Sequence, residues 1–324
     1  MSVAKTVNTR KRAIIRSILV WGGTASLLTY LGLTTNLPET WRALTLANPL
    51  YLAIVAIGFV AITFSTDVSS VRFLLKRGGF DVHTADLFRI KGASYLLNIL
   101  NYNLALAMMA ATLSRHTDKG LGTTGSPFIY LNFIDLAIMS IQVLVGVWFA
   151  ELPFPDAAVT VLLLISACGL LSPFALWGIV RVRHLPPFMS KILGHAIFSS
   201  CRDLSFAELL RLFGLRALLI IEYLFMTYCF LRVFGIKVPL DALLVYSPIL
   251  ALVAFIPISI AGLGSTQVVM RIFYAPFAPI GIDPIASVDA YSTVSLLVIL
   301  SVRIGISLVC LPAVSRMMGK SQQE

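Results

Sequence analysis

Charged residues are scarce in this sequence. Only 12% of its 324 residues are Asp, Glu, Lys or Arg, and 58% are hydrophobic. Soluble domains carry about 25% charged and about 45–50% apolar residues, so too few charges remain here to cover a globule of this size. The composition therefore excludes a soluble enzyme and a secreted domain held together by disulfides. It predicts a protein whose surface faces lipid.

Cysteine and histidine are also few, and they show no metal-binding pattern. The chain has four of each and no CxxC pair, so buried structural thiols and surface histidines are expected. A Walker loop, an HExxH zinc motif and a strand-borne GxGxxG motif are missing as well. We therefore expect no catalytic residue, no metal and no cofactor, and a function that is not enzymatic.

Long apolar runs, by contrast, are abundant. Runs of about 20 apolar residues are long enough to cross a bilayer core as helices, whereas a lone strand or loop leaves backbone groups unsatisfied in lipid. We predict an all-α polytopic membrane protein that forms one integral membrane domain over residues 1–324. The runs cover about residues 17–33, 50–73, 87–113, 128–149, 157–180, 209–234, 240–260, 267–280 and 291–317.

The basic residues lie in short stretches between these runs, where the cytoplasmic charge bias explains them. Residues 1–16 are strongly basic, and no A-x-A-like cleavage site follows Leu33, so an uncleaved first span is expected. Arg316 and Lys320 place the C-terminus on the same side. We predict a multi-pass protein of the cell membrane with both termini in the cytoplasm. The net charge of +10 therefore does not indicate a nucleic-acid partner.

The charges of all the loops indicate one consistent topology only if residues 87–113 do not cross the membrane as a single helix. A full crossing would place the basic loop at Arg115 outside, whereas a segment that enters and returns keeps every later loop consistent. Asn98, Asn101 and Asn103 cluster at the centre of this segment. They favour a first interrupted segment there.

A second interrupted segment is expected at residues 240–280. Both ends of this segment must lie on the outer side of the membrane. Pro248, Pro257, Gly262 and Gly264 break its helical pattern. A re-entrant pair and two short spans both fit, because each gives an even number of crossings.

The predicted topology has about six full transmembrane helices and two interrupted hairpins that enter from opposite sides. The longest polar stretch, residues 181–208, is expected to be a cytoplasmic amphipathic segment. Interrupted segments in both halves point to a transporter-type binding site near the midplane. The alternative is that both are kinked, packed helices.

Four ionisable residues inside the apolar segments are the candidates for a binding site. Charges at mid-membrane cost about 2.5–3.5 kcal/mol on insertion scales, so they usually face a cavity or a partner. In one interpretation Glu222 and Arg303 form a structural ion pair. In the other, Arg303 and Arg271 meet a phosphate while Glu222 and Asp135 meet a cationic or hydroxylated headgroup. Both signs of charge suit a phospholipid headgroup better than a simple anion.

The stretch from Phe255 to Gln267 reads FIPISIAGLGSTQ. It resembles the IPIS-x-x-G-x-G-x-x-E signature of the lysylphosphatidylglycerol synthase transmembrane region, also called the flippase-like domain family. Asn98 falls where that family has an Asn in its first interrupted segment, and Asp135 resembles the acidic residue near the start of the following span. This chain departs from the family pattern at Gln267, where Glu is frequent, and at residues 101–103, where a Pro-Gly-Glu-type turn is frequent.

The motif also suits a ligand site on physical grounds. Pro257 lacks an N–H and bends a helix, while Gly262 and Gly264 let backbone approach a ligand closely. Ser259 and Gln267 supply polar groups at the break. A helix that starts near residue 265 would favour a phosphate at its N-terminus.

The resemblance implies a stand-alone membrane domain without the aminoacyl-transferase domain, and hence lipid translocation rather than lipid aminoacylation. The substrate would be an anionic or zwitterionic phospholipid or a polyprenyl-linked lipid. A membrane enzyme is a second hypothesis, with Asp81, His83 and Asp86 as its only candidate site. A third is a non-transporting scaffold or accessory subunit, which has a partner enzyme of lipid or glycan synthesis.

Overall fold

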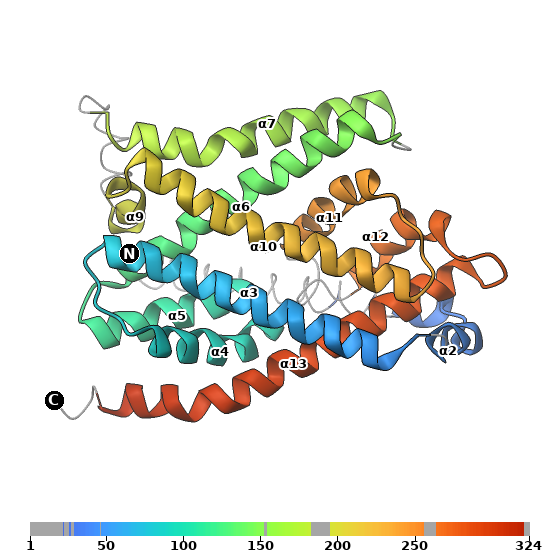
Figure 1. The fold of residues 1–324 in the computed structure, drawn as a ribbon, viewed down its shortest axis with the longest axis horizontal. Helices are drawn as coiled ribbons and strands as arrows, with labels where there is room; N and C mark the ends of the chain where they lie inside the picture. The colour runs from blue at the N-terminus through green and yellow to red at the C-terminus, as the bar shows by residue number, and fades with distance from the viewer. Residues whose placement is uncertain are drawn as a thin grey trace, which may run out of the picture. The chain divides into compact units, whose positions relative to one another are not determined.

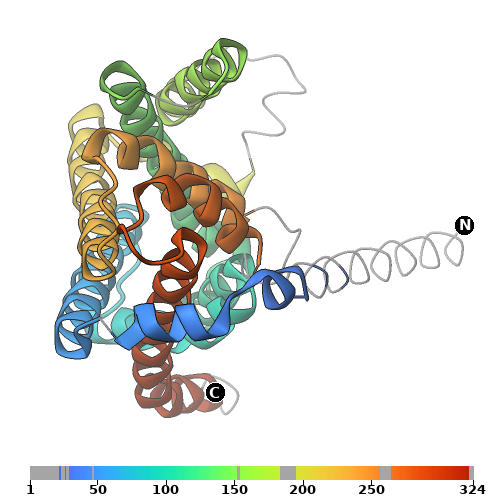
Figure 2. The same ribbon diagram turned by 90° about the vertical axis from the view of Figure 1, so that its right-hand side faces the viewer.

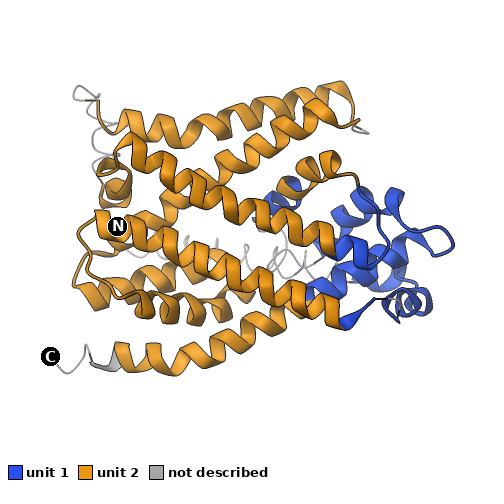
Figure 3. Ribbon diagram, in the orientation of Figure 1, with its two compact units in different colours: residues 1–49, 230–238, 249–296 blue, residues 50–229, 239–248, 297–324 orange. Residues whose placement is uncertain are grey.

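The computed structural model describes residues 22, 26, 29–45, 47–151, 154–182, 195–255 and 264–320. Every regular element in these ranges is a helix, and no strand is found among them. The chain divides into two compact units (Figure 3). Unit 1 comprises residues 1–49, 230–238 and 249–296, and unit 2 comprises residues 50–229, 239–248 and 297–324.

Unit 2 holds most of the long helices (Figure 1). Helices α6 and α7 pack side by side, and α4 and α5 form a hairpin whose second arm contacts α6 (Figures 1 and 2). A buried apolar core joins these helices to α3 and α10. The described helices that lie wholly or mostly in unit 2 are α3 (Pro49–Arg77), α4 (Thr84–Leu100), α5 (Tyr102–Thr117), α6 (Leu121–Phe149), α7 (Asp156–Ile179), η1 (Ala196–Phe198), α9 (Ser199–Arg202), α10 (Phe206–Val233) and α11 (Leu240–Phe255).

Unit 1 is smaller and is built from short helices and helix ends. The helices that lie wholly in this unit and have described bounds at both ends are α2 (Leu37–Thr45), α12 (Ser265–Tyr274) and η3 (Ala275–Phe277). The long helix α13 (Pro284–Lys320) begins in unit 1 and continues into unit 2 from residue 297.

Four described helices are long and apolar enough to cross a membrane by themselves: α3, α6, α7 and residues 284–317 of α13. They match four of the six expected full crossings and confirm the all-α polytopic class. Helix α10 has 28 residues, but Arg211, Arg216 and Glu222 lower its apolar character. The first expected span, at residues 17–33, lies mostly outside the described residues.

The interruption expected within residues 87–113 is present at Asn101. This residue has an extended backbone, with φ −164° and ψ 130°, and it separates α4 from α5. Its side-chain oxygen accepts hydrogen bonds from the backbone N–H groups of Asn103, at 2.8 Å, and Leu104, at 3.3 Å. Asn101 therefore caps the new helix, which explains why a polar residue stands at the centre of an apolar segment.

The second interruption separates α11 from α12. Pro257, Ser259 and Gly262 fall in the stretch 256–263, which lies outside the described residues. Of the amphipathic segment expected at 181–208, residues 183–194 also lie outside them.

Glycines allow close helix contacts within unit 2. A Cβ atom on Gly92 of α4 would collide with Cys310 of α13, and one on Gly146 of α6 would lie 3.0 Å from the carbonyl oxygen of Asp241 in α11. Small residues at such contacts let membrane helices approach closely, because dispersion contacts rather than the hydrophobic effect hold helices together in lipid.

Candidate functional site

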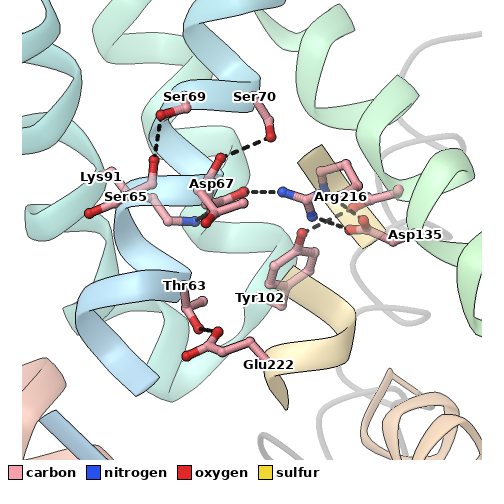
Figure 4. A network of polar contacts seen from close by, with 12 residues as sticks. Thr63, Ser65, Asp67, Ser69, Ser70, Lys91, Tyr102, Asp135, Arg216 and Glu222 are labelled. Atoms are coloured by element: carbon pink, nitrogen blue, oxygen red, sulfur yellow. Dashed lines mark hydrogen bonds and ion pairs between the residues drawn. The ribbon is translucent and has the colours of Figure 1, made fainter. Parts of the chain in front are cut away.

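Four charged side chains from four helices meet inside unit 2 (Figure 4). Arg216 of α10 donates from Nε to Oδ1 of Asp135 on α6 at 2.6 Å, and from Nη1 to Oδ1 of Asp67 on α3 at 2.5 Å. Its Nη2 also pairs with Oδ2 of Asp135, and Lys91 of α4 pairs with Oδ2 of Asp67. We call Asp67, Lys91, Asp135 and Arg216 the charge cluster.

The charge cluster contains two positive and two negative groups, so its charges balance. Arg216 is only 4% exposed and its planar guanidinium binds one carboxylate with two N–H groups and a second carboxylate with a third. Removing one partner of a buried pair typically costs about 3–5 kcal/mol, because the remaining charge is left uncompensated. The cluster therefore ties α3, α4, α6 and α10 together.

Neither Asp67 nor Arg216 is among the four ionisable candidates of the sequence, and nothing in the sequence brings the two together. One local signal was available for Asp67. It lies in the run Ser65-Thr66-Asp67-Val68-Ser69-Ser70, an unusually polar stretch within an apolar helix. Arg216 had no comparable signal, because only tertiary packing shows that it faces α3 and α6.

A tyrosine at the first interruption lies beside the charge cluster (Figure 4). Tyr102, the first residue of α5, donates from its hydroxyl to Oδ1 of Asn132 on α6 at 3.0 Å. Asn132 precedes Asp135 by one helical turn, so both side chains lie on the same face of α6. The break at Asn101 therefore brings α5 against the polar face of α6. Asn98 is half-buried in the last turn of α4.

Glu222 lies near the charge cluster but does not belong to it. Its Oε2 accepts a hydrogen bond from the hydroxyl of Thr63 on α3 at 2.8 Å (Figure 4). Its Oε1 is buried and has no hydrogen-bond partner in the described part of the chain. A buried polar atom without a partner typically costs about 1–3 kcal/mol. Glu222 thus carries an unfilled acceptor inside the helix bundle of unit 2.

Arg303 of α13 is the corresponding unfilled donor. Its guanidinium lies over the ring of Tyr95 on α4, 5.4 Å from the ring centroid, and its Nε is buried without a hydrogen-bond partner among the described residues. Glu222 and Arg303 therefore each keep one unfilled polar atom in the described part of the chain. Nevertheless, no ion pair joins the two within the described ranges, so they are not the structural pair considered in the first interpretation.

Arg271 belongs to a separate polar group in unit 1. It binds Asp289 of α13 with two hydrogen bonds, Nε to Oδ1 at 2.7 Å and Nη2 to Oδ2 at 2.7 Å. It also donates to the hydroxyls of Thr34, at 2.6 Å, and Thr35, at 2.8 Å. Arg271 is 7% exposed and fully engaged. The structure therefore places two of the four ionisable candidates, Arg271 and Asp135, in internal ion pairs and leaves Glu222 and Arg303 with unfilled atoms.

The end of the glycine motif caps α12. Gly264 has φ 90°, a backbone conformation that residues with a Cβ rarely adopt, and it directly precedes the helix. The Oε1 of Gln267 accepts a hydrogen bond from the N–H of Gly264. This is the reciprocal half of a capping box, in which Gln serves as well as Glu.

His, Cys, Asp and Glu side chains, the usual metal ligands, occur among the described residues. No group of three or more His, Cys, Asp and Glu side chains is placed there to hold a metal ion. Burial raises the pKa of the Cys201 thiol to about 11, so it stays protonated at neutral pH. In the trio considered for a membrane enzyme, Asp86 binds Arg89 at 3.0 Å, and Asp81 and His83 are exposed.

A comparison with protein families matches this chain to the model described as "Lysylphosphatidylglycerol synthase TM region". The match covers residues 14–316, nearly the whole chain, and confirms the resemblance carried by residues 255–267. A comparison with curated proteins found no match.

Proposed function

Because this chain belongs to the family of the lysylphosphatidylglycerol synthase TM region, we propose that it is a lipid translocator. It moves a phospholipid or a polyprenyl-linked lipid between the leaflets of the cell membrane, with both termini in the cytoplasm. The observation that carries the proposal is the pair of unfilled polar atoms on Glu222 and Arg303. Ionisable groups at membrane depth are costly and are typical of substrate pathways.

The arrangement of polar groups supports a path for a headgroup. Thr63 and Asp67 lie one turn apart on the same face of α3, so polar side chains continue from the charge cluster to Glu222. A headgroup that leaves water needs such groups, because a polar or charged group in hydrocarbon must replace its lost hydrogen bonds. Helices α3, α4, α10 and α13 provide these replacements and no covalent step is required, so the proposed function is not enzymatic.

The second candidate function is a non-transporting scaffold or accessory subunit of a lipid or glycan synthesis complex. A scaffold needs the helical fold, and it gains nothing from a buried acceptor and a buried donor that are left unfilled. The charge cluster alone would suit a scaffold, because all its members are paired. The unfilled atoms of Glu222 and Arg303 favour the translocator.

Reconstitution tests the proposal. The purified protein is placed in vesicles that contain fluorescently labelled phosphatidylglycerol, and dithionite is added outside to destroy accessible label. Translocation exposes inner-leaflet label, so fluorescence falls below the level reached in protein-free vesicles. A fluorescence loss equal to that of protein-free vesicles, for this probe and for labelled phosphatidylethanolamine and a labelled polyprenyl phosphate, favours the scaffold.

A further inference from the structure

Glu222 is an acid inside α10 of unit 2, and no cation is paired with it among the described residues. Its Oε2 contacts the hydroxyl of Thr63 on α3 at 2.8 Å, and its Oε1 is buried without a hydrogen-bond partner in the same part of the chain (Figure 4). We infer that Glu222 is a proton-binding site that holds a proton at neutral pH, and that its protonation and deprotonation are coupled to lipid movement. The second half of this inference rests on the proposed function.

Two other carboxylates in the helices of unit 2 show how an ionised acid is accommodated there. Asp135 binds the guanidinium of Arg216 at two points, and Asp67 is paired with both Arg216 and Lys91. A buried carboxylate needs such cations, because burial removes the water that would otherwise stabilise its charge. Glu222 has one hydroxyl donor and no cation within the described ranges. Its surroundings therefore favour the neutral, protonated acid.

Thr63 fits both protonation states of Glu222. A hydroxyl group can donate one hydrogen bond and can also accept, and its hydrogen rotates to suit the partner. The contact of 2.8 Å between Thr63 and Oε2 therefore persists when Oε2 carries the proton and donates to the hydroxyl instead. Oε1 is then a carbonyl oxygen, for which a missing hydrogen bond costs less than for a charged oxygen. A proton can thus enter and leave Glu222 while α3 and α10 stay in contact.

The other charged groups around the helix bundle have contacts of their own. The four members of the charge cluster, on α3, α4, α6 and α10, pair with one another. Arg303 of α13 lies over the ring of Tyr95 on α4, and no ion pair joins it to Glu222 within the described ranges. Tyr223, which follows Glu222 in α10, contacts the ring of Phe59 on α3. A proton is therefore the positive charge that remains to neutralise Glu222.

The position of Glu222 explains how a proton can control lipid movement. Its partner Thr63 lies one turn from Asp67 on the same face of α3, so Glu222 borders the polar path proposed for a headgroup. An ionised carboxylate repels the phosphate of a lipid, whereas a neutral acid does not. Protonation of Glu222 thus opens the path to a phosphate, and loss of the proton closes it. A proton gradient across the membrane then gives the movement its direction.

Infrared spectroscopy tests the proton site directly. The purified protein is measured at neutral pH in a detergent without ester groups, where a protonated carboxyl group gives a carbonyl band separate from the amide bands. We expect this band in wild type, its loss in Glu222→Gln, and its retention in Asp81→Asn, which removes an exposed carboxylate.

Isotopic labelling makes the assignment independent of the folding of any variant. Labelling the side-chain carboxyl carbon of glutamate should shift the band of wild-type protein, whereas a band from aspartic acid would stay in place. The absence of a protonated glutamate band at neutral pH would overturn the inference.

Vesicles with a proton gradient test the coupling. The outer pH is held constant and the inner buffer is varied, so that dithionite acts in the same solution in every sample. A gradient in one direction should speed the movement of labelled phosphatidylglycerol by wild type and by Arg72→Gln, a control at an exposed position of α3. Glu222→Gln, which has no proton to release, should lose this response. Wild-type movement that ignores gradients of both directions would overturn the coupling.

The two tests separate this inference from the proposed function. If the glutamate band is present and wild-type protein moves no labelled lipid under any gradient, the proton site stands and the translocator proposal fails. If labelled lipid moves while the band is missing and gradients have no effect, translocation stands and the assignment of Glu222 fails.

Discussion

Arg216 of α10 and Asp135 of α6 form a two-point pair in the interior of unit 2, with Nε and Oδ1 2.6 Å apart and a second contact from Nη2 to Oδ2. The same guanidinium reaches Asp67 of α3 at 2.5 Å. One side chain therefore links three helices of unit 2. Its charge is balanced inside the protein, which separates this stabilising group from the unfilled atoms of Glu222 and Arg303.

Arg216→Met should strongly destabilise the protein, by about 3–5 kcal/mol, because it leaves Asp67 and Asp135 without their shared cation. Arg216→Lys should recover only part of the loss, because a single ammonium cannot form the two-point pair. Thermal unfolding in detergent measures the effect. A midpoint for Arg216→Met equal to that of Arg72→Gln would contradict the role of the cluster.

Asn101→Ala should cost about 1 kcal/mol, because it removes the side-chain cap of α5. Asn101→Ser should retain most of the stability, since a hydroxyl oxygen accepts the same type of backbone hydrogen bond without adding a charge. Hydrogen exchange of residues 102–106 reports directly on the start of α5. Faster exchange in Asn101→Ser than in Asn101→Ala would contradict this account.

Gly92→Ala should disturb the contact between α4 and α13, because the added Cβ collides with Cys310. Cys310→Ala in the same chain removes the sulfur that the new Cβ meets most closely, and it should restore part of the lost thermal midpoint. Gly178→Ala is the matched control, since a Cβ at Gly178 meets nothing within 4 Å. The tight contact would be refuted if Cys310→Ala gave Gly92→Ala no recovery.

Arg271→Met should loosen unit 1, because it leaves the buried carboxylate of Asp289 without its cation. We expect faster hydrogen exchange in residues 265–274 and at the start of α13. Thr34→Val removes only one of the hydrogen bonds of Arg271 and should cost about 1 kcal/mol. Identical exchange in Arg271→Met and wild-type protein would show that the pair contributes nothing to unit 1.

The sequence predicts the helices better than it predicts the polar contacts between them. Apolar runs locate α3, α6, α7 and α13, and the Asn cluster locates the break at Asn101. Both features depend on residues that are close along the chain. The pairing of Arg216 with Asp67 joins residues 149 positions apart, and it depends on which helix faces meet, which no local pattern records.

Contacts between residues far apart in the chain also decide which of the ionisable candidates are paired. Asp135, Glu222, Arg271 and Arg303 all stand out in the sequence because each interrupts or closely follows apolar residues. Helical periodicity does not reveal that Asp289 and Arg216 supply counter-charges for two of them. Only the three-dimensional arrangement distinguishes the two that are satisfied from the two that are not.

The central claim is that the protein moves lipid between leaflets. It is tested most directly by the rate at which labelled phosphatidylglycerol moves between the two leaflets of vesicles that contain wild-type, Arg303→Gln, Glu222→Gln or Arg72→Gln protein. Thermal midpoints first establish that each variant is folded. We predict that wild type and Arg72→Gln move the lipid, that Arg303→Gln loses most of this activity, and that Glu222→Gln is slowed. Wild-type rates in folded Arg303→Gln protein would contradict a lipid path that passes Arg303.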